Sequence, residues 1–531
     1  MAKARLLILP LLLCGGAVHA RDVVDASEPT DLAVTVYRDP NRGQGEEMDR
    51  DWPQGFAMIS ETRTVTLPAG ESTIRFEGVA EGMVAVSAIV TGLPGGTIEK
   101  NRNADLLSPA ALVDGTLGNR VRITRTNPGT GAEQVEEAII RTRADGGLVL
   151  QTGDGFEAVR CSGLPERLTF GAVPDGLSSE PVFTIDTHDE AGGTYEVTLT
   201  YLAWGFDWQA NYVATLLEGG DSDNVRLRLM SWLTILNDNN QGFENAELMA
   251  VAGSLNVVSD FEGLSDPPAA RPLRLTCYPL GSSLRGSAIP RGNFGREERI
   301  VVTGSRIQRE VFESALAATP MMAVSDAVLA EEEQLGDLKL YRIPSLVDVR
   351  AQGLKQVAFL DKGNVEGRYV YRTQCEPRRE RGGLVPTELL FATVNDEEHG
   401  LGVALPSGAI AFFEPSSADE LLVGEQNLRD FASGQDVELT LGLSSQVFAK
   451  CERLSKHDPY MENAPWTRMR TTLSNANPTD VSVRVLLGSP AQWDYRGTNS
   501  ELKDGQRIVE VAVPANGEKV VEWQIRPALA E

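Results

Sequence analysis

The fold class of this chain is decided by one seven-residue stretch, Tyr195-Glu196-Val197-Thr198-Leu199-Thr200-Tyr201. Its side chains alternate without a break, so that Val197, Leu199 and Tyr201 fall on one face and the residues between them on the other. A period of two residues is typical of a half-buried β-strand. We therefore predict a strand whose apolar face lies in a hydrophobic core.

The same alternation recurs toward both ends of the chain. Residues 59–67 and 72–76 predict two strands, and the turn at residues 68–71 leads us to expect that they form a β-hairpin. Residues 481–485 and 508–513 alternate likewise. Short strands separated by Gly, Pro and Asn favour antiparallel sandwiches over a parallel α/β sheet. The expected fold class is all-β, with tandem antiparallel β-sandwich-like domains and one inserted helical or linker segment.

The insertion is predicted at about residues 266–335. Residues 266–299 are rich in Pro, Gly, Ser and Arg, which is typical of a linker or a long insertion. Ser325 and Asp326 are suitable N-terminal caps for a helix that runs on to the acidic residues 331–333. This is the one helix that we expect in the chain.

The N-terminus has the pattern of a secretory signal. Lys3 and Arg5 precede an apolar run over residues 6–13, and a cleavage sequence ends at Ala20. We expect residues 1–20 to be a signal peptide, cleaved near Ala20, that exports the protein to the periplasm or the extracellular space. No later run reaches the roughly 18 apolar residues of a transmembrane helix, so the mature chain is expected to contain no transmembrane segment.

Four of the five cysteines follow this leader. An even number suits disulfide bonds in an oxidising compartment, and four cysteines allow three pairings. Cys375 and Cys451 fall in one predicted domain, so we favour that bond, and a bond between Cys161 and Cys277 follows by elimination. The absence of a CxxC spacing argues against a zinc ribbon or a redox motif.

The composition disfavours several classes of function. The chain has 75 acidic and 49 basic residues, a net charge of −26. Such a surface repels phosphate backbones and anionic membranes, so we expect no nucleic-acid partner. With four histidines, a histidine-rich metal site is not expected either, and we assign no cofactor.

From residue 195 onward, several patterns follow one another in a characteristic order. They are Tyr195 to Trp204 with Trp208 and Tyr212, an Asn-containing turn in residues 236–248, the LPSG start of residues 405–410, and the steps at 422–425 and 441–442. Together, over residues 192–527, they resemble domain of unknown function 4139, a family related to mucoidy inhibitor A. The resemblance implies a secreted or cell-envelope β-protein. It carries over no catalytic residue, because that family has none assigned. Two departures are Phe243, where the family has Trp, and the long insertion.

We accordingly expect four parts in the chain. After the signal peptide of residues 1–20 come an N-terminal β domain over residues 21–190 and a central β domain over residues 191–464, which the insertion interrupts. An immunoglobulin-like β-sandwich over residues 465–531 completes the chain.

Two acidic clusters are the best candidates for chemistry. Residues 186–190 (DTHDE) and 396–400 (DEEHG) each offer carboxylates beside a histidine, suited to a divalent cation or to acid–base catalysis. We interpret both as polar hairpin loops, and the pair His457 and Asp458 lacks a nucleophile motif. There is no serine-hydrolase, zinc-protease, P-loop or dinucleotide motif, so we assign no catalytic, cofactor-binding or metal-binding residue.

One segment of the insertion resembles a partner-binding peptide. Ile300, Val301, Val302 and Thr303 follow acidic residues, as in the TonB box of outer-membrane receptors, an extended peptide that adds a strand to a partner's sheet. The alternative is an ordinary β-strand that ends at a Thr-Gly turn.

The sequence thus predicts an exported cell-envelope protein that binds or scaffolds envelope proteins or polysaccharide without catalysis. One alternative is a glycan-directed hydrolase, which needs two carboxylates about 5–9.5 Å apart. Its candidate carboxylates are Asp186, Asp189, Glu397 and Glu398. A second alternative is a partner of TonB-type envelope machinery that binds through Ile300 to Thr303.

Overall fold

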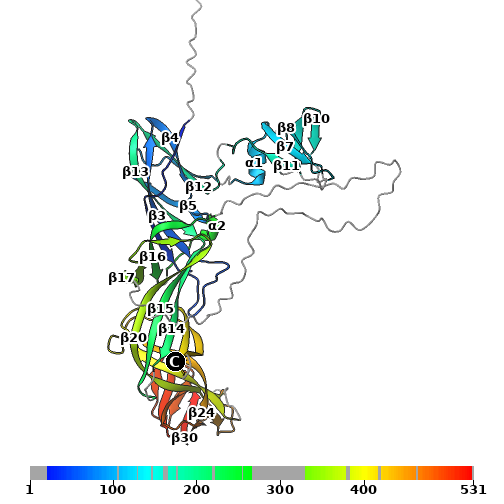
Figure 1. Cartoon of the computed structure of the whole chain (residues 1–531). Helices are drawn as coiled ribbons and strands as arrows, with labels where there is room; N and C mark the ends of the chain where they lie inside the picture. Colours follow the sequence, from blue (N-terminus) through cyan, green and yellow to red (C-terminus); the bar gives the residue numbers. More distant parts are fainter. Residues whose placement is uncertain are drawn as a thin grey trace, which may run out of the picture. The chain divides into compact units, whose positions relative to one another are not determined.

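The computed structural model describes residues 21–528 except for 104–106, 128, 145–147, 159–165, 175–176, 218–221, 254, 266–328, 378–382, 417–419 and 462–463. Thirty strands and two short helices make up the regular structure of these residues (Figure 1). The predicted all-β fold class is confirmed. Cys161, Cys277 and the Ile300 to Thr303 segment lie outside the described residues.

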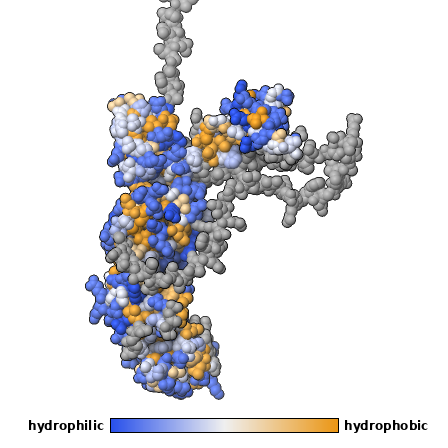
Figure 2. Space-filling model, viewed as in Figure 1, coloured by the Kyte–Doolittle hydropathy of each residue, from blue (hydrophilic) through white to orange (hydrophobic). Residues whose placement is uncertain are grey.

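The chain forms two compact units that alternate along the sequence. Of the described residues, unit 1 contains those within 21–31, 60–202 and 263–265, and unit 2 contains those within 32–59, 203–262 and 329–528. Hydrophilic residues cover most of the described surface in the view of Figure 2, and hydrophobic residues form separate patches there.

Unit 1 contains two sets of paired strands besides a smaller sheet. The first is a four-stranded sheet in the order β1 (Asp22–Asp25), β4 (Gly70–Glu77), β12 (Val182–Asp189) and β6 (Glu99–Asn103). The second set has the order β3 (Phe56–Leu67), β13 (Gly193–Trp204) and β5 (Met83–Thr91). Val197, Leu199 and Tyr201 of β13 are buried, as the alternation predicts. Hydroxyl pairs join β3 to β13, namely Ser60 with Thr200, Thr62 with Thr198 and Thr66 with Thr194.

The predicted hairpin over residues 59–76 is wrong, although both of its strands exist. β3 pairs with β13, whereas β4 pairs with β1 and β12 in the other sheet. The turn at Pro68 and Ala69 therefore carries the chain from one sheet to the other. Leu67 and Ile74 are both buried, and an alternating pattern does not reveal whether two such strands share a sheet or face each other across a core.

A smaller sheet in unit 1 has its own core. Its order is β10 (Gly155–Ala158), β9 (Val149–Thr152), β8 (Glu133–Ile140), β7 (Arg120–Thr126) and β11 (Glu166–Thr169). Helix α1 (Pro109–Gly115) packs on it through Val113, which clusters with Ile123 and Leu150. The Ser108 side chain accepts a hydrogen bond from the amide of Ala111, which caps the helix.

Unit 2 begins with a sheet in the order β17 (Glu331–Leu335), β18 (Leu338–Arg342), β16 (Phe243–Ala252) and β2 (Asp31–Tyr37), with β19 (Val347–Val349) paired to β16. The short helix α2 (Phe261–Ser265) follows β16. The expectation of a helix through residues 331–333 is wrong, because these glutamates form β17. Ion pairs from Glu332 to Lys339 and from Glu333 to Arg342 hold them against β18.

The remaining strands of unit 2 form one long sheet. Its order is β23 (Glu420–Leu428), β22 (Gly408–Pro415), β14 (Phe206–Leu216), β15 (Val225–Asn237), β20 (Gly353–Gln374), β21 (Val385–Val394), β24 (Asp436–Arg453), β25 (Thr467–Asn475), β30 (Gly517–Pro527) and β27 (Trp493–Arg496). Off this path, β26 (Val481–Gly488) pairs with β20 and β29 (Gln506–Val513), and β28 (Glu501–Lys503) pairs with β29. The 22 residues of β20 pair first with β15 and then with β21 and β26.

The C-terminal strands enclose a separate hydrophobic core. Val483, Met469 and Trp523 lie in it, together with both cysteines of a disulfide bond. The predicted alternating strands at residues 481–485 and 508–513 are present as β26 and β29, which pair antiparallel. The long strands β20 and β24 thus connect this core to the rest of unit 2.

Candidate functional site

The carboxylates of residues 186–190 make structural bonds within unit 1. Asp186 is buried, and it accepts a hydrogen bond from the Thr73 hydroxyl at 2.6 Å and pairs with Arg21. Asp189 accepts a hydrogen bond from the Tyr195 hydroxyl at 2.6 Å, which lowers the pKa of this carboxyl. The expectation of a polar loop is wrong here, since Asp186 and Asp189 belong to β12. Their bonds leave little capacity for a cation or for acid–base work.

The second acidic cluster forms a turn after β21. Nδ1 of His399 lies 2.7 Å from Oδ1 of Asp396, and this contact lowers the pKa of the Asp396 carboxyl. Both side chains are partly exposed. Within the described part of the chain, no hydroxyl or thiol is hydrogen-bonded to the other ring nitrogen of His399. The pair therefore lacks the nucleophile that a hydrolytic triad requires.

His457 and Asp458 do not form a pair. Nε2 of His457 lies 2.8 Å from the Thr467 hydroxyl oxygen, and Asp458 accepts a hydrogen bond from the amide of Tyr460. The carboxylate therefore does not orient the imidazole, and both side chains stabilise the loop before β25.

The aromatic residues of β14 lie in a core. Trp208 and Tyr212 are fully buried, with Nε1 of Trp208 3.1 Å from the carbonyl oxygen of Val251. The Tyr212 hydroxyl donates to the carbonyl oxygen of Pro406, in the LPSG sequence, at 2.7 Å. Both residues have the structural role that the sequence indicates.

Sequence reasoning missed a buried ion pair beside these aromatic residues. Asp207 pairs with Arg42, and both side chains are almost fully buried. Burial raises the pKa of the Asp207 carboxyl to about 6, although Arg42 and the amides of Trp208 and Asp39 lower it. The Arg42 guanidinium also donates to the carbonyl oxygen of Trp208 at 3.0 Å. The sequence signal was Asp207 itself, the one acidic residue of β14.

A second ion pair secures the start of β22. Arg38 donates two hydrogen bonds to the carboxylate of Asp430, at 2.9 and 2.7 Å, and one to the Ser407 hydroxyl. Asp430 also accepts a hydrogen bond from the amide of Ser407 at 2.8 Å. Because every one of these groups is bonded within the protein, the network is structural.

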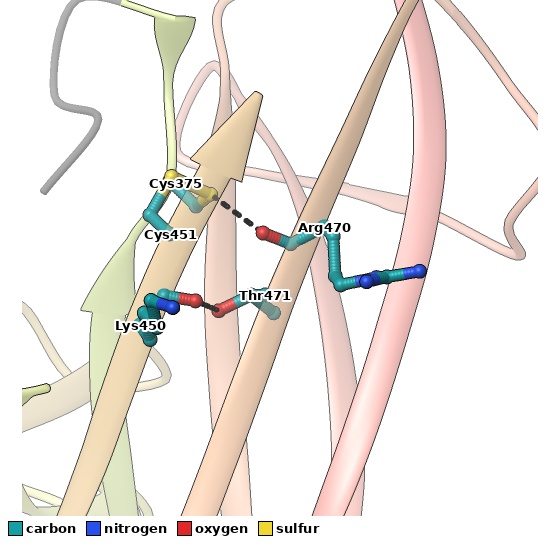
Figure 3. Close-up of a disulfide and its surroundings, with 5 residues drawn as sticks. All are labelled: Cys375, Lys450, Cys451, Arg470 and Thr471. Atoms are coloured by element: carbon teal, nitrogen blue, oxygen red, sulfur yellow. Dashed lines mark hydrogen bonds between the residues drawn. A yellow bond between two sulfur atoms is a disulfide. The ribbon is translucent and has the colours of Figure 1, made fainter. Parts of the chain in front are cut away.

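The predicted disulfide between Cys375 and Cys451 is confirmed (Figure 3). The two Cα atoms are 5.3 Å apart, and the bond joins the segment after β20 to β24 across 76 positions of sequence. Beside it, the Thr471 hydroxyl donates to the carbonyl oxygen of Lys450 at 3.2 Å. The bond ties the end of β20 to β24, a strand of the same long sheet.

A cavity of about 530 Å³ lies beside this disulfide, and Cys451 forms part of its wall. Strands β20, β21, β24, β26 and β29 all contribute to it. Its apolar lining is aliphatic and comes from Val385, Pro386, Leu443, Ala449 and Leu486. Residues from strands far apart in sequence thus meet here, and the volume lies within the roughly 300–1,000 Å³ range of small-ligand sites.

One polar residue of the lining, Gln506, has a buried side-chain atom without a partner. Oε1 of Gln506 is buried and accepts no hydrogen bond. A buried side-chain oxygen in this state costs about 1–3 kcal/mol relative to a bonded one. Arg372 and Glu388 also line the cavity and form an ion pair at 2.7 Å. This cavity is the candidate functional site, and no sequence motif marks it.

The described residues contain no group of three or more His, Cys, Asp or Glu side chains placed to hold a metal ion. Among the same residues, no helix has both the length and the apolar character to cross a membrane.

No protein-family model matches this chain, and no curated protein has a detectably similar sequence. The likeness to domain of unknown function 4139 therefore stays a prediction.

Proposed function

We propose that this protein is an exported binding protein of the Gram-negative cell envelope, that it acts without catalysis, and that its ligand occupies the cavity beside Cys451. One observation carries the proposal. Gln506, whose Oε1 is buried without a hydrogen-bond partner, is among the residues that line a cavity of ligand size. A ligand that donates a hydrogen bond to this oxygen would remove the free-energy cost of burying it unpaired.

The charges of the cavity support binding rather than hydrolysis. Among the described residues that line it, Glu388 is the one carboxylate, and Arg372 neutralises it. Glycoside hydrolysis needs two carboxylates on either side of the bond that breaks. Asp186 and Asp189, two of the four candidate carboxylates of the hydrolase alternative, are already bonded to Arg21 and Tyr195.

Export is supported by the leader and the disulfide together. Disulfide bonds persist in oxidising compartments such as the periplasm, and the bond between Cys375 and Cys451 joins two buried residues of the C-terminal core. The residues before Arg21 have the composition of a signal peptide.

The test is a thermal-shift screen of the mature protein against short peptides and neutral oligosaccharides. Leu443 is 70% exposed and lines the cavity, so Leu443→Trp should narrow the cavity without unfolding the protein. Leu421→Trp is the matched control, because Leu421 is 57% exposed on β23 and is not a cavity residue.

We expect at least one class of compound to raise the melting temperature of the wild type and of Leu421→Trp, but not of Leu443→Trp. A stabilisation that Leu443→Trp retains in full would place the ligand elsewhere. No stabilisation by any member of the screen would contradict the proposal.

A further inference from the structure

One end of the disulfide between Cys375 and Cys451 faces the cavity. Lys450 and Glu452 form an ion pair at 2.8 Å on one face of β24. Because successive side chains of a strand point to opposite faces, the Cys451 side chain points to the other face. Ala449 lies on that same face, and both Ala449 and Cys451 line the cavity. The Cys451 end of the bond is therefore presented to the cavity.

The two cysteines differ in their access to solvent. Cys451 is 6% exposed and lines the cavity, whereas Cys375 is 1% exposed and is not among the lining residues. The mouth of the cavity lies where the lining is much more exposed, at Leu443 (70%) and the Glu388 side chain (45%). A small molecule that enters from this side therefore reaches Cys451 before Cys375.

A disulfide bond reacts with thiols by exchange. A thiolate attacks one sulfur atom of the bond and displaces the other, and the rate depends on access to the attacked atom. The cavity of about 530 Å³ lies beside the bond, and this volume suits small molecules. It admits a low-molecular-weight thiol such as glutathione, but not a folded oxidoreductase domain.

The sulfur atom that such an attack displaces has a hydrogen-bond acceptor nearby. Sγ of Cys375 lies 3.8 Å from the carbonyl oxygen of Arg470 (Figure 3). Once the disulfide opens, the Cys375 thiol can donate a weak hydrogen bond to this oxygen. A buried thiol with an acceptor costs less free energy than one without. Attack on Cys451 with displacement of Cys375 is therefore the favoured direction.

We propose that Cys451 is a site of reversible S-thiolation by a low-molecular-weight thiol that enters the cavity. The thiolate attacks Sγ of Cys451, so that a new sulfur–sulfur bond forms and the bond to Cys375 breaks. Cys375 leaves as a thiolate and takes up a proton from water. Attack of the Cys375 thiolate on the mixed disulfide reverses the reaction and releases the small thiol. The exchange needs no other ligand, so it goes beyond the proposed function and does not depend on it.

Two serine variants compare the sulfur atoms directly. Cys375→Ser leaves Cys451 as a thiol, Cys451→Ser leaves Cys375 as a thiol, and both variants lose the same disulfide. Each variant, shown to be folded by circular dichroism, is incubated with oxidised glutathione, and peptide mass spectrometry measures the mixed disulfide at that cysteine. We expect the adduct to form at Cys451 at least about tenfold faster than at Cys375, because exchange follows access to the sulfur atom.

A narrower cavity should slow this exchange. In the Cys375→Ser background, Leu443→Trp should slow adduct formation at Cys451 about tenfold, because less of the sulfur atom is accessible. Leu421→Trp is the matched control on β23, away from the cavity, and should have no effect. Equal adduct rates at the two cysteines, or a rate at Cys451 that Leu443→Trp leaves unchanged, would overturn the proposal.

Reduction of the wild-type disulfide by dithiothreitol gives a measurement that needs no cysteine variant. Its rate should rise in proportion to the thiol concentration and change little in urea below the unfolding transition, because the exchange takes place in the folded protein. Leu443→Trp should slow it, and Leu421→Trp should not. A rate that rises steeply with urea would show that the disulfide reacts only after unfolding, and the proposal would fall.

Discussion

The indole N–H of Trp208 donates a hydrogen bond to the carbonyl oxygen of Val251 at 3.1 Å. This bond joins β14 of the long sheet to the end of β16 in the other sheet of unit 2. The same indole contacts the ring of Tyr341 edge-on, with 6.2 Å between the ring centroids. Trp208 is therefore a link between two sheets and has no face left for a ligand.

The first prediction concerns this link. Trp208→Ala should lower the free energy of unfolding by about 3–5 kcal/mol, because it removes a large buried ring and leaves a cavity. Trp52→Ala is the matched control, since Trp52 is 54% exposed, and it should have little effect. Urea denaturation followed by circular dichroism measures both. An unchanged midpoint in Trp208→Ala would show that the ring is not part of the core.

The second prediction concerns Gly408, the glycine of the LPSG sequence. Gly408 pairs with Ala210 in parallel strands, and a Cβ at position 408 would overlap the carbonyl oxygen of Ala210. Gly408→Ala should therefore destabilise the protein by several kcal/mol or prevent folding, since backbone atoms must move to admit it. Gly363→Ala is the control, because a Cβ there meets no atom within 4 Å. Equal melting temperatures for the two variants would contradict the prediction.

The sequence predicted elements better than it predicted their partners. Alternation located β13, β26 and β29, because burial of one strand face imposes a period of two. It did not show that β3 and β4 lie in different sheets, since alternation carries no information on pairing. The glutamates of β17 were mistaken for a helix end, because their strand is stabilised by the cross-strand partners Lys339 and Arg342, which a local pattern does not include.

The candidate site could not be predicted from the sequence, for a related reason. The cavity is lined from strands between Arg372 and Gln506, and no two of its polar groups form a recognisable motif. The acidic clusters did form a motif-like pattern, yet Asp186 and Asp189 are bonded within the sheet. What marks the site is an unpaired oxygen on Gln506, a property of packing rather than of residue type.

The third prediction concerns the buried pair of Arg42 and Asp207. Asp207→Asn leaves the guanidinium buried without a counter-charge, so at pH 8 it should cost about 3–5 kcal/mol of stability. Arg42→Met leaves a buried carboxylate instead. Since burial already raises the pKa of Asp207 to about 6, this carboxyl takes up a proton on acidification, and the cost of Arg42→Met should be smaller at pH 5 than at pH 8.

The direction of this pH dependence follows from the pKa of Asp207 in the folded and the unfolded state. The pKa of Asp207 in the folded state lies above the ordinary 3.8. The contribution of this group to the stability of the folded protein is therefore complete below pH 3.8 and is lost as the pH rises through 6. Urea unfolding at both pH values measures the effect. A cost of Arg42→Met that is larger at pH 5 would contradict it.

The fourth prediction concerns the disulfide between Cys375 and Cys451. Replacing both residues with Ser should lower the stability of the C-terminal core by about 2–4 kcal/mol, because the unfolded chain gains freedom over a long loop. Reduced wild-type protein should match the double variant. The sequence also predicts no free thiol in the mature protein. Titration of denatured, unreduced protein checks this, and two reactive thiols would mean that Cys161 and Cys277 are unpaired.

The last prediction concerns the way in which the stability of the C-terminal strands depends on pH through Glu510 of β29. Its carboxylate accepts hydrogen bonds from Arg368 at 2.6 Å, from Ser482 at 2.9 Å and from Arg484 at 3.1 Å. Partial burial raises the pKa of Glu510, but these bonds outweigh it and lower the pKa to about 2 from an ordinary 4.5.

The pKa of Glu510 is lower in the folded state. Its contribution to the stability of the folded protein is therefore complete above pH 4.5 and is lost as the pH falls from 4.5 toward 2. After allowance for solvent screening, the expected loss is about 1–2 kcal/mol. Glu510→Gln should be less stable than the wild type at pH 7, and the difference should shrink steadily below pH 4.5. The exposed residue Glu501 provides the control, because Glu501→Gln should follow the wild-type profile throughout. A difference between Glu510→Gln and the wild type that stays constant from pH 7 to pH 2.5 would show that the bonds from Arg368 and Ser482 do not stabilise the charged form of this carboxyl.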